Sequence, residues 1–581
     1  MSASKVTILV VGDGVAALMA ALAAADQGAR VQLVSEVPQR RAFDVCRSDG
    51  IAGVLDGDLT GDSIESHIED TVRGGDWLAH QGAVRRMCEQ APQLLRLCAR
   101  MGVLFNRTPE GRMRQVAGGG MARRRVAFTD IATGHELVGA LDEQVSREEA
   151  AGRIVRTENI RFMGLVKEDH GVCVGIVGAD MRTLGVRAYP ADAVILCTGG
   201  YAGLYGVTTV PSRYAGAVAA QVYCQGAAFA NPEFVQFHPA AIIGAGAAHP
   251  LSELTCAFGA HLHVPHEGRT WRFIEEAHPV SGGRVPYDIA ARAVHKVIFE
   301  MKRGVAGESA VLFSCDEEHQ PELFRELTHL GAQCRTFADV DMRADAVKVT
   351  PAAHYTMGGL WVDTRHMTTI HGLFAAGECA YQYHGANALG ANVLLAALHG
   401  GMTAGEAAMR YAEGHEGAAA QVGTSVYERA TDLHAAELKE LMGRSEGENP
   451  RVIRGECAAL MATHAGIARD NTVLAEADAK IKELSARCAK ACLADRSSYA
   501  NACVFMLHGL TKELTLAELV VHAARARDES RGAHYKTAFP ARNDKKWAVI
   551  TKAMYSPQGP KFDYQEKVDV SEFAPTVRGY E

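Results

Sequence analysis

The residues from Ile8 to Glu36 constrain the fold of this chain more than any other stretch. An apolar run at 8–11 is long enough for a buried parallel strand, and Gly12 and Gly14 follow it directly. An alanine-rich segment, typical of a helix, then leads to a second apolar run at 31–34. With Ala17 in the third position, the pattern is the G-x-G-x-x-A fingerprint of a dinucleotide-binding β-α-β unit.

Each small residue of this fingerprint has a physical task. Gly12 permits the tight turn, Gly14 lets the backbone approach a pyrophosphate, and Ala17 lets the helix lie against the sheet. The free N–H groups and partial positive charge at the helix N-terminus favour the phosphates. Glu36 is placed to accept hydrogen bonds from a ribose. The unit therefore predicts a bound dinucleotide, and by itself it leaves FAD and NAD open.

Length and composition narrow the remaining possibilities. A chain of 581 residues predicts two to four domains, and a net charge of −8 argues against a nucleic-acid surface. No apolar run approaches the ~18 residues of a membrane span, and no secretory signal peptide is visible. The 14 cysteines are scattered without C-x-x-C spacing, which suits a reducing cytoplasm and predicts no iron–sulfur or zinc ligand set within this chain.

The dinucleotide-binding pattern is interrupted and then resumes. An apolar run ending at Cys197 leads into Thr198, Gly199 and Gly200, a second close backbone approach expected near the adenosine end of FAD. A later strand ends at Glu378, and an apolar helix follows from Val393. A dinucleotide-binding domain formed by two segments that flank an insertion favours FAD over NAD. We therefore predict an α/β fold with a two-dinucleotide (Rossmann-like) FAD-binding domain at 1–241 and 349–415, an inserted α+β capping domain at 242–348, a helical domain at 416–528 and a small C-terminal domain at 529–581.

Two features have both an ordinary and a functional interpretation. His238 precedes Pro239 where a strand exits into a loop, so it is either a satisfied buried histidine or a site residue. The three arginines at 123–125 are either part of a solvated loop or an anion site fed by backbone amides.

Several motifs resemble those of one family over nearly the whole chain. They are GDGVAALMA, FNRTPEG, CTGG, QFHPAA, PAAHYTMGGLWVD, GLFAAGE, HGANALGANVLL, RDESRGAHY and the closing FDYQEKVDVSEFAPTVR. Together they resemble the flavoprotein subunit of succinate dehydrogenase and fumarate reductase, especially the form that works with menaquinone. The resemblance implies hydride transfer between flavin N5 and a substrate carbon, an iron–sulfur partner subunit and a membrane anchor made of other chains. It also implies a place at the inner face of the cytoplasmic membrane.

The fingerprint and the resemblance together give the predicted site. The cofactor-binding residues are Gly12, Gly14, Ala17, Glu36, Thr198, Gly199, Gly200, Glu378 and Asn392. The catalytic residues are His238, Glu253, Tyr287 and His354, and the substrate-binding residues are Ser252, Arg125 and His384. We expect a small-molecule substrate, no metal site and no nucleic acid.

The departures from the family pattern are as informative as the matches. Phe43 stands where the family has the histidine that bonds to the flavin, so we expect non-covalent FAD. Tyr287 replaces the proton-donating arginine, and Ala388 replaces an arginine that binds a substrate carboxylate. Each desolvated arginine–carboxylate pair contributes about 2–5 kcal/mol, so the losses disfavour a dicarboxylate. We expect C–C desaturation or its reverse next to a carbonyl, with Tyr287 as acid or base.

Two alternatives stay open. Relocated charge from Arg284, Arg123 or Arg124 would restore true succinate or fumarate chemistry. A subunit that kept its FAD and partner surfaces without the reaction would serve a structural or electron-relay role.

Overall fold

The central feature of the fold is a five-stranded parallel sheet with the order β19-β10-β1-β2-β6. The computed structural model describes residues 6–244, 247–415 and 417–580, so the predicted domain limits at residues 1, 416 and 581 lie outside the described residues. The apolar run of the fingerprint forms the middle strand, whose residues Ile8 to Val10 are completely buried. The strands are β1 (Thr7–Gly12), β2 (Arg30–Val34), β6 (Ile154–Thr157), β10 (Ala193–Cys197) and β19 (Leu373–Ala375).

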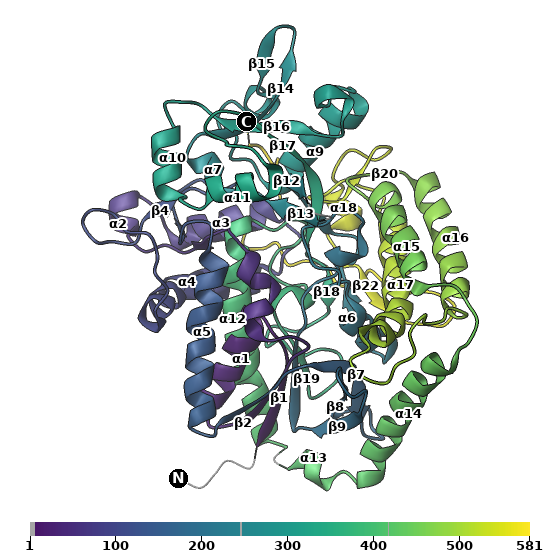
Figure 1. The fold of residues 1–581 in the computed structure, drawn as a ribbon. Coiled ribbons are helices and arrows are strands. Elements are labelled where there is room, and N and C mark those ends of the chain that lie inside the picture. The colour runs from purple at the N-terminus through teal and green to yellow at the C-terminus, as the bar shows by residue number, and fades with distance from the viewer. Residues whose placement is uncertain (1–5, 245–246, 416, 581) are drawn as a thin grey trace.

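Small residues let two long helices pack closely beside this sheet. The helix α1 (Val15–Asp26) packs against α12 (Gly390–Glu413) and α5 (Thr133–Ala150), which lie alongside it in Figure 1. A Cβ atom at Gly401 would lie 2.4 Å from the carbonyl oxygen of Ala16, and one at Gly405 would lie 2.5 Å from that of Ala20. The alanine-rich sequence of α1 is therefore explained by close helix contact, as the fingerprint predicts.

Further elements surround this core. The segment after β2 contributes α2 (Gly57–Thr60), α3 (Ile64–Gly74), α4 (Gln81–Met101) and the small sheet of β3 (Ile51–Ala52), β4 (Gln115–Val116) and β5 (Val126–Ala127). A separate antiparallel sheet and a short helix precede the insertion: β7 (Ile160–Lys167), β8 (Cys173–Asp180), β9 (Val186–Pro190) and α6 (Ala217–Cys224).

The inserted region is built on a six-stranded sheet with the order β13-β12-β17-β16-β14-β15, at the top of Figure 1. The two strands that connect it to the FAD-binding region, β12 (Val235–Gly244) and β17 (Val347–Thr356), pair antiparallel with each other. Both extend beyond the predicted limits of the insertion, so they carry His238 and His354 at the junction. The other elements are β13 (Ala247–Pro250), α7 (Leu254–Ala257), β14 (Ala260–His266), β15 (Arg269–Trp271), α8 (Phe273–Ala277), α9 (Tyr287–His295), β16 (Val311–Cys315), α10 (Gln320–Glu326) and α11 (Leu330–Ala338).

Helices dominate the chain after α12. They are α13 (Ala418–Gln421), α14 (Thr424–Gly443), α15 (Pro450–His464), α16 (Asn471–Cys488), α17 (Ala502–Ala526) and α18 (Asp544–Trp547), and β20 (Ala468–Arg469) pairs with β21 (Tyr535–Lys536). In the described ranges, no helix combines the length and the apolar character needed to cross a bilayer.

The last part of the chain returns to both earlier regions. The strands β22 (Lys552–Met554) and β23 (Lys561–Asp563) extend a four-stranded sheet that also contains β11 (Phe229–Ala230) and β18 (Gly359–Leu360). Arg578 binds both carboxylate oxygens of Asp288, in the first turn of α9, at 2.5 and 3.1 Å. It also donates to the backbone carbonyls of Arg73 and Gly74, at the end of α3. The C-terminal segment thus links the inserted region to the FAD-binding region.

Candidate active site

The fingerprint residues line one end of a groove at the carboxyl ends of the central strands. A cavity of about 570 Å³ is bordered by Gly12, Glu36, Arg161 and Thr198. Glu36 follows β2 and accepts a hydrogen bond from Nη1 of Arg161 at 2.6 Å. Asp13 and Tyr214 border both this cavity and a second one of about 530 Å³. The two cavities therefore adjoin at the N-terminus of α1.

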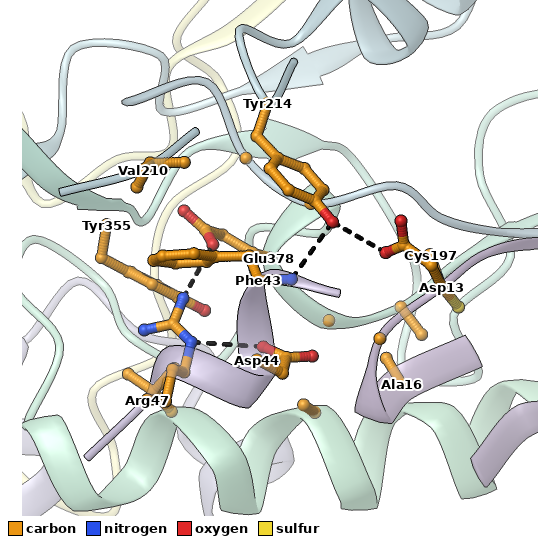
Figure 2. A pocket seen from close by; sticks show the side chains of 17 residues that line it. Asp13, Ala16, Phe43, Asp44, Arg47, Cys197, Val210, Tyr214, Tyr355 and Glu378 are labelled. Atoms are coloured by element: carbon orange, nitrogen blue, oxygen red, sulfur yellow. Dashed lines mark hydrogen bonds and ion pairs between the residues drawn. The ribbon is translucent and has the colours of Figure 1, made fainter. Parts of the chain in front are cut away.

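The second cavity contains charged side chains that the fingerprint does not predict (Figure 2). Nη2 of Arg47 donates to Glu378 at 3.1 Å, and its Nε donates to Asp44 at 3.3 Å. The rings of Phe43 and Tyr355 lie 4.9 and 5.2 Å from the guanidinium carbon. The Arg47 side chain is 3% exposed, and its Nη1 is buried without a hydrogen-bond partner. This cavity therefore holds a cation with one unused donor.

Burial sets the protonation of the acids along the groove. Burial raises the pKa of Glu378 to about 7, although the Arg47 guanidinium and the backbone N–H of Thr356 partly offset it. Burial likewise raises the pKa of Asp13 to about 6, although the Tyr214 hydroxyl, which donates to Asp13 at 2.9 Å, opposes that rise. Both carboxyl groups thus titrate close to neutral pH.

The four residues predicted to be catalytic gather at the junction between the two regions. The ring centres of His238 and His354 lie 5.1 Å apart, and that of Tyr287 lies 4.8 Å from His238. Glu253, His238 and Tyr287 border a third cavity of about 550 Å³. The Tyr287 hydroxyl donates to Oδ1 of Asp49 at 3.3 Å. A Cβ atom at Gly390 would lie 2.6 Å from the Glu253 carboxylate, so this acid rests against the start of α12.

Burial shifts the pKa values of the histidines, the acid and the tyrosine in this cluster toward their uncharged forms. Burial lowers the pKa of His238 to about 3, and burial together with His238 and Arg47 lowers the pKa of His354 well below its usual range. Burial first, and the nearby Asp49 second, raise the pKa of Glu253 well above its usual range. Burial and these two acids also raise the pKa of Tyr287. The cluster thus combines histidines whose pKa is lowered with a phenol and acids whose pKa is raised, so burial favours the uncharged form of each group.

Asp49 is a site residue that the sequence did not reveal. It is 5% exposed, and burial raises its pKa although Arg47 opposes that rise. Asp49 and Tyr287 are 238 residues apart in the chain, so no local pattern connects them. The available signal was the charged sequence D-V-C-R-S-D directly after Phe43, which contains Asp44, Arg47 and Asp49.

The structure gives several other predicted residues structural partners. The guanidinium of Arg125 is completely buried and binds Asp62 and Asp70, both at 2.6 Å. This placement does not support the predicted substrate-binding role, because four of its five N–H donors already serve Asp62, Asp70 and Ser66. The amide of Asn392 binds His67 and Thr71 on α3. The Ser252 hydroxyl donates to the carbonyl of Ser48.

His384 differs from these because it keeps an unused donor or acceptor. It is 5% exposed, and its Nε2 is buried without a partner. Its ring meets that of Tyr355 edge to face at 5.3 Å, which places it near the second cavity.

Arginines that could restore a dicarboxylate clamp lie mostly outside the cluster. Arg123 and Arg124 are exposed. Arg284 borders the third cavity, and it is also exposed. Arg47 is buried, but Asp44 and Glu378 already bind it. Among the described residues that border the third cavity, Arg284 is the one arginine.

The groove has backbone turns and polar groups that suit a flavin dinucleotide. Gly12 has a φ of +151°, and a Cβ atom there would lie 2.2 Å from the carbonyl oxygen of Cys197. Gly199, with a φ of +73°, forms the matching turn after β10. Glu36 lies at one end of the groove, and Glu378 with the unused Nη1 of Arg47 lies at the other. These residues could hold a ribose, a pyrophosphate and a second polar ring system in sequence.

Comparisons with known proteins agree with this geometry. The FAD binding domain family model matches residues 7–394, and the fumarate reductase flavoprotein C-term model matches residues 454–580. The succinate dehydrogenase flavoprotein subunit of Bacillus subtilis (strain 168) is 40% identical over 579 residues, which cover 99% of each chain. The fumarate reductase flavoprotein subunit of Mycobacterium tuberculosis (strain ATCC 25618 / H37Rv) is 32% identical and covers 94% of each. The FrdA chain of E. coli quinol fumarate reductase has a TM-score of 0.90 at 28% identity, covering 99% of this chain and 98% of that one.

The fold and site thus define an FAD-dependent oxidoreductase of the class that acts on CH–CH groups. More particularly, the chain belongs to the family of succinate dehydrogenase and fumarate reductase flavoprotein subunits. The predicted α/β fold and the predicted family are both confirmed.

Proposed function

We propose that this chain is the catalytic flavoprotein subunit of a succinate dehydrogenase-like complex whose substrate is less anionic than succinate. The single observation that carries this proposal is the composition of the junction cluster. His238, Tyr287 and Glu253 border the third cavity, where the one arginine among the described lining residues is the exposed Arg284. His354 and Asp49 adjoin this group through His238 and Tyr287. The buried Arg47 lies near them, but Asp44 and Glu378 already bind it. Two carboxylates placed there would lack strong partners, whereas a carbonyl needs only hydrogen-bond donors.

The chain's own residues divide the chemistry between binding and proton transfer. FAD, when bound, supplies a hydride acceptor and donor at N5. His238 and His354, neutral and 5.1 Å apart, bind and polarise a substrate carbonyl. The Tyr287 hydroxyl exchanges a proton with the carbon next to the one that exchanges the hydride. Asp49 accepts a hydrogen bond from Tyr287, and with Glu253 it supplies or receives that proton.

We propose that FAD is held without a covalent bond. Phe43 borders the second cavity, and its phenyl ring carries no nucleophilic nitrogen, oxygen or sulfur atom that could form a bond to a flavin carbon. Acid precipitation of the purified protein should therefore release the yellow colour into the supernatant. Colour retained in the pellet would contradict non-covalent binding.

We also propose an iron–sulfur partner subunit and a membrane anchor subunit, which would place the chain at the inner face of the cytoplasmic membrane. The support is similarity over 99% of the length of a succinate dehydrogenase flavoprotein subunit, including the C-terminal region matched at 454–580. Co-purification from a membrane extract would test it.

A screen of flavin redox change separates this function from genuine succinate or fumarate chemistry. The purified complex would be mixed anaerobically with ketones, enoates, succinate and fumarate while flavin absorbance is followed. We expect a change with a neutral or monoanionic carbonyl compound and none with succinate. Bleaching by succinate would favour genuine succinate or fumarate chemistry. Two observations support that alternative: the 40% identity to a succinate dehydrogenase subunit and the position of Arg284 at the third cavity.

The variant Tyr287→Phe tests the proton-transfer role. Removal of the hydroxyl should slow turnover of the substrate found in the screen by about 10² or more, as is typical for loss of a general acid or base. Tyr223→Phe is the matched control, because the Tyr223 hydroxyl is buried without a partner in α6. Unchanged turnover in Tyr287→Phe would remove Tyr287 from the mechanism.

A further inference from the structure

A carboxylate of this chain already lies at the position that the fingerprint provides for a phosphate. Val15 is the first residue of α1, and its backbone N–H has no partner within the helix. Oδ2 of Asp44 accepts that N–H at 2.8 Å. The same oxygen lies 2.3 Å from where a Cβ atom at Gly14 would be. Asp44 thus fills the space that the absent side chain of Gly14 leaves at the helix N-terminus.

The neighbouring residues hold this carboxylate in place. Asp44 lies in a short 3₁₀ segment, Phe43–Cys46, whose first N–H donates to the Tyr214 hydroxyl at 3.3 Å. Nε of Arg47 donates to the other Asp44 oxygen at 3.3 Å, and Glu378 fixes Arg47 from the opposite side. Figure 2 shows this row of contacts along one wall of the second cavity.

A second observation indicates that the same cavity is built for a polar ligand. Nη1 of Arg47 is buried without a partner, although the side chain is only 3% exposed. A buried guanidinium donor that serves no group of the protein is costly unless a ligand supplies an acceptor. The cavity therefore has an unused donor for a ligand and an anion position that Asp44 occupies.

Asp44 and a pyrophosphate cannot use this position together. Both are anionic, and like charges a few ångströms apart in a largely buried site repel strongly. Asp13, which is 8% exposed, adds a further acid at the same turn. An incoming pyrophosphate therefore has to displace the Asp44 carboxylate from the Val15 N–H.

We propose that Asp44 is an internal occupant of the pyrophosphate position and that its displacement sets the affinity of this chain for FAD. The inference rests on the proposed non-covalent FAD site. The need to displace Asp44 weakens FAD binding for a reason separate from Phe43. The pyrophosphate has to replace the contact of Asp44 with the Val15 N–H and its ion pair with Arg47. Arg47 keeps its partner Glu378 when Asp44 leaves.

Titration of the apoprotein with FAD, followed by flavin fluorescence, tests this inference without any substrate. Asp44→Asn keeps the shape of the side chain but removes its charge, and Asp44→Ala removes the cap. Both should lower the Kd for FAD by about tenfold or more, because the repulsion with the pyrophosphate is gone. The matched control is Asp345→Asn, which makes the same charge change at an exposed position and should leave the Kd unchanged.

The outcomes separate the two proposals. A Kd that stays the same or rises in both Asp44 variants, with normal binding by the wild type, would overturn the role of Asp44 and leave the FAD site intact. Absence of FAD binding by the wild type and by both variants would overturn the FAD site and the role of Asp44 together.

Discussion

At the scale of single residues, burial decides what a charge does in this protein. Arg123 and Arg125 are two positions apart in one loop, yet Arg123 is exposed whereas Arg125 is completely buried between Asp62 and Asp70. The first is a solvated cation, whereas the second pairs with the buried Asp62 and shares the buried Asp70 with Arg73. The same contrast separates the exposed Arg284 from Arg47.

Replacement of Arg125 should therefore affect stability. Arg125→Met leaves Asp62 buried without its cation and leaves Asp70 with Arg73 alone, and breaking a buried pair typically lowers the free energy of unfolding by about 3–5 kcal/mol. Arg123→Met should change it by less than about 0.5 kcal/mol, because the side chain is exposed. Urea unfolding of the two variants measures the difference. Equal stability would show that the ion-pair cluster contributes little.

Glu378 should give the apoprotein a pH-dependent stability. Its pKa is about 7 in the folded chain, against 4.5 for an ordinary glutamate, so the unfolded chain loses this proton first as the pH rises. The free energy of unfolding should fall from pH 4.5 to 7 by up to about 3 kcal/mol from this group, and the contribution is fully present below pH 4.5.

Glu378→Gln removes this proton equilibrium. Compared with the wild type, its Tm should fall less between pH 5 and pH 7 in buffers of equal ionic strength. Parallel Tm profiles for the two proteins would contradict the raised pKa.

At the scale of elements, the start of α9 matters most for the site. Its first residue is Tyr287 and its second is Asp288, which Arg578 binds through both oxygens. Because Arg578 also binds the end of α3, it fixes the position of Tyr287 relative to the FAD-binding region. The phenol is therefore positioned by a contact outside its own sheet and helices.

Loss of this contact should loosen α9 locally. In Arg578→Met, amide hydrogen exchange in peptides covering 281–295 should accelerate by about tenfold, as expected when local opening becomes easier. Peptides from α16 should be unchanged, and Arg410→Met is the control because Arg410 is 61% exposed. Unchanged exchange at 281–295 would show that α9 is held by its other contacts.

At the scale of the whole molecule, the features encoded by short sequence patterns were predicted better than those that depend on contacts between distant parts of the chain. The fingerprint correctly predicted β1, α1 and β2, because each apolar run and glycine acts within about 30 residues. The prediction that His238 lies where a strand exits into a loop was wrong, because His238 lies inside β12, which pairs with the strand that carries His354. The role of Asp49 in the site and the ion pairs of Arg125 with Asp62 and Asp70 could not be predicted, because these contacts depend on how separate regions of the chain pack. The roles assigned to the site residues remain predictions.

The bond between Arg578 and Asp288 joins residues that are 290 positions apart. During synthesis on the ribosome, α9 therefore emerges long before the arginine that anchors it. The inserted region is therefore translated before its contact with Arg578 can form. A nascent chain would thus lack this anchor beside Tyr287 until Arg578 has emerged.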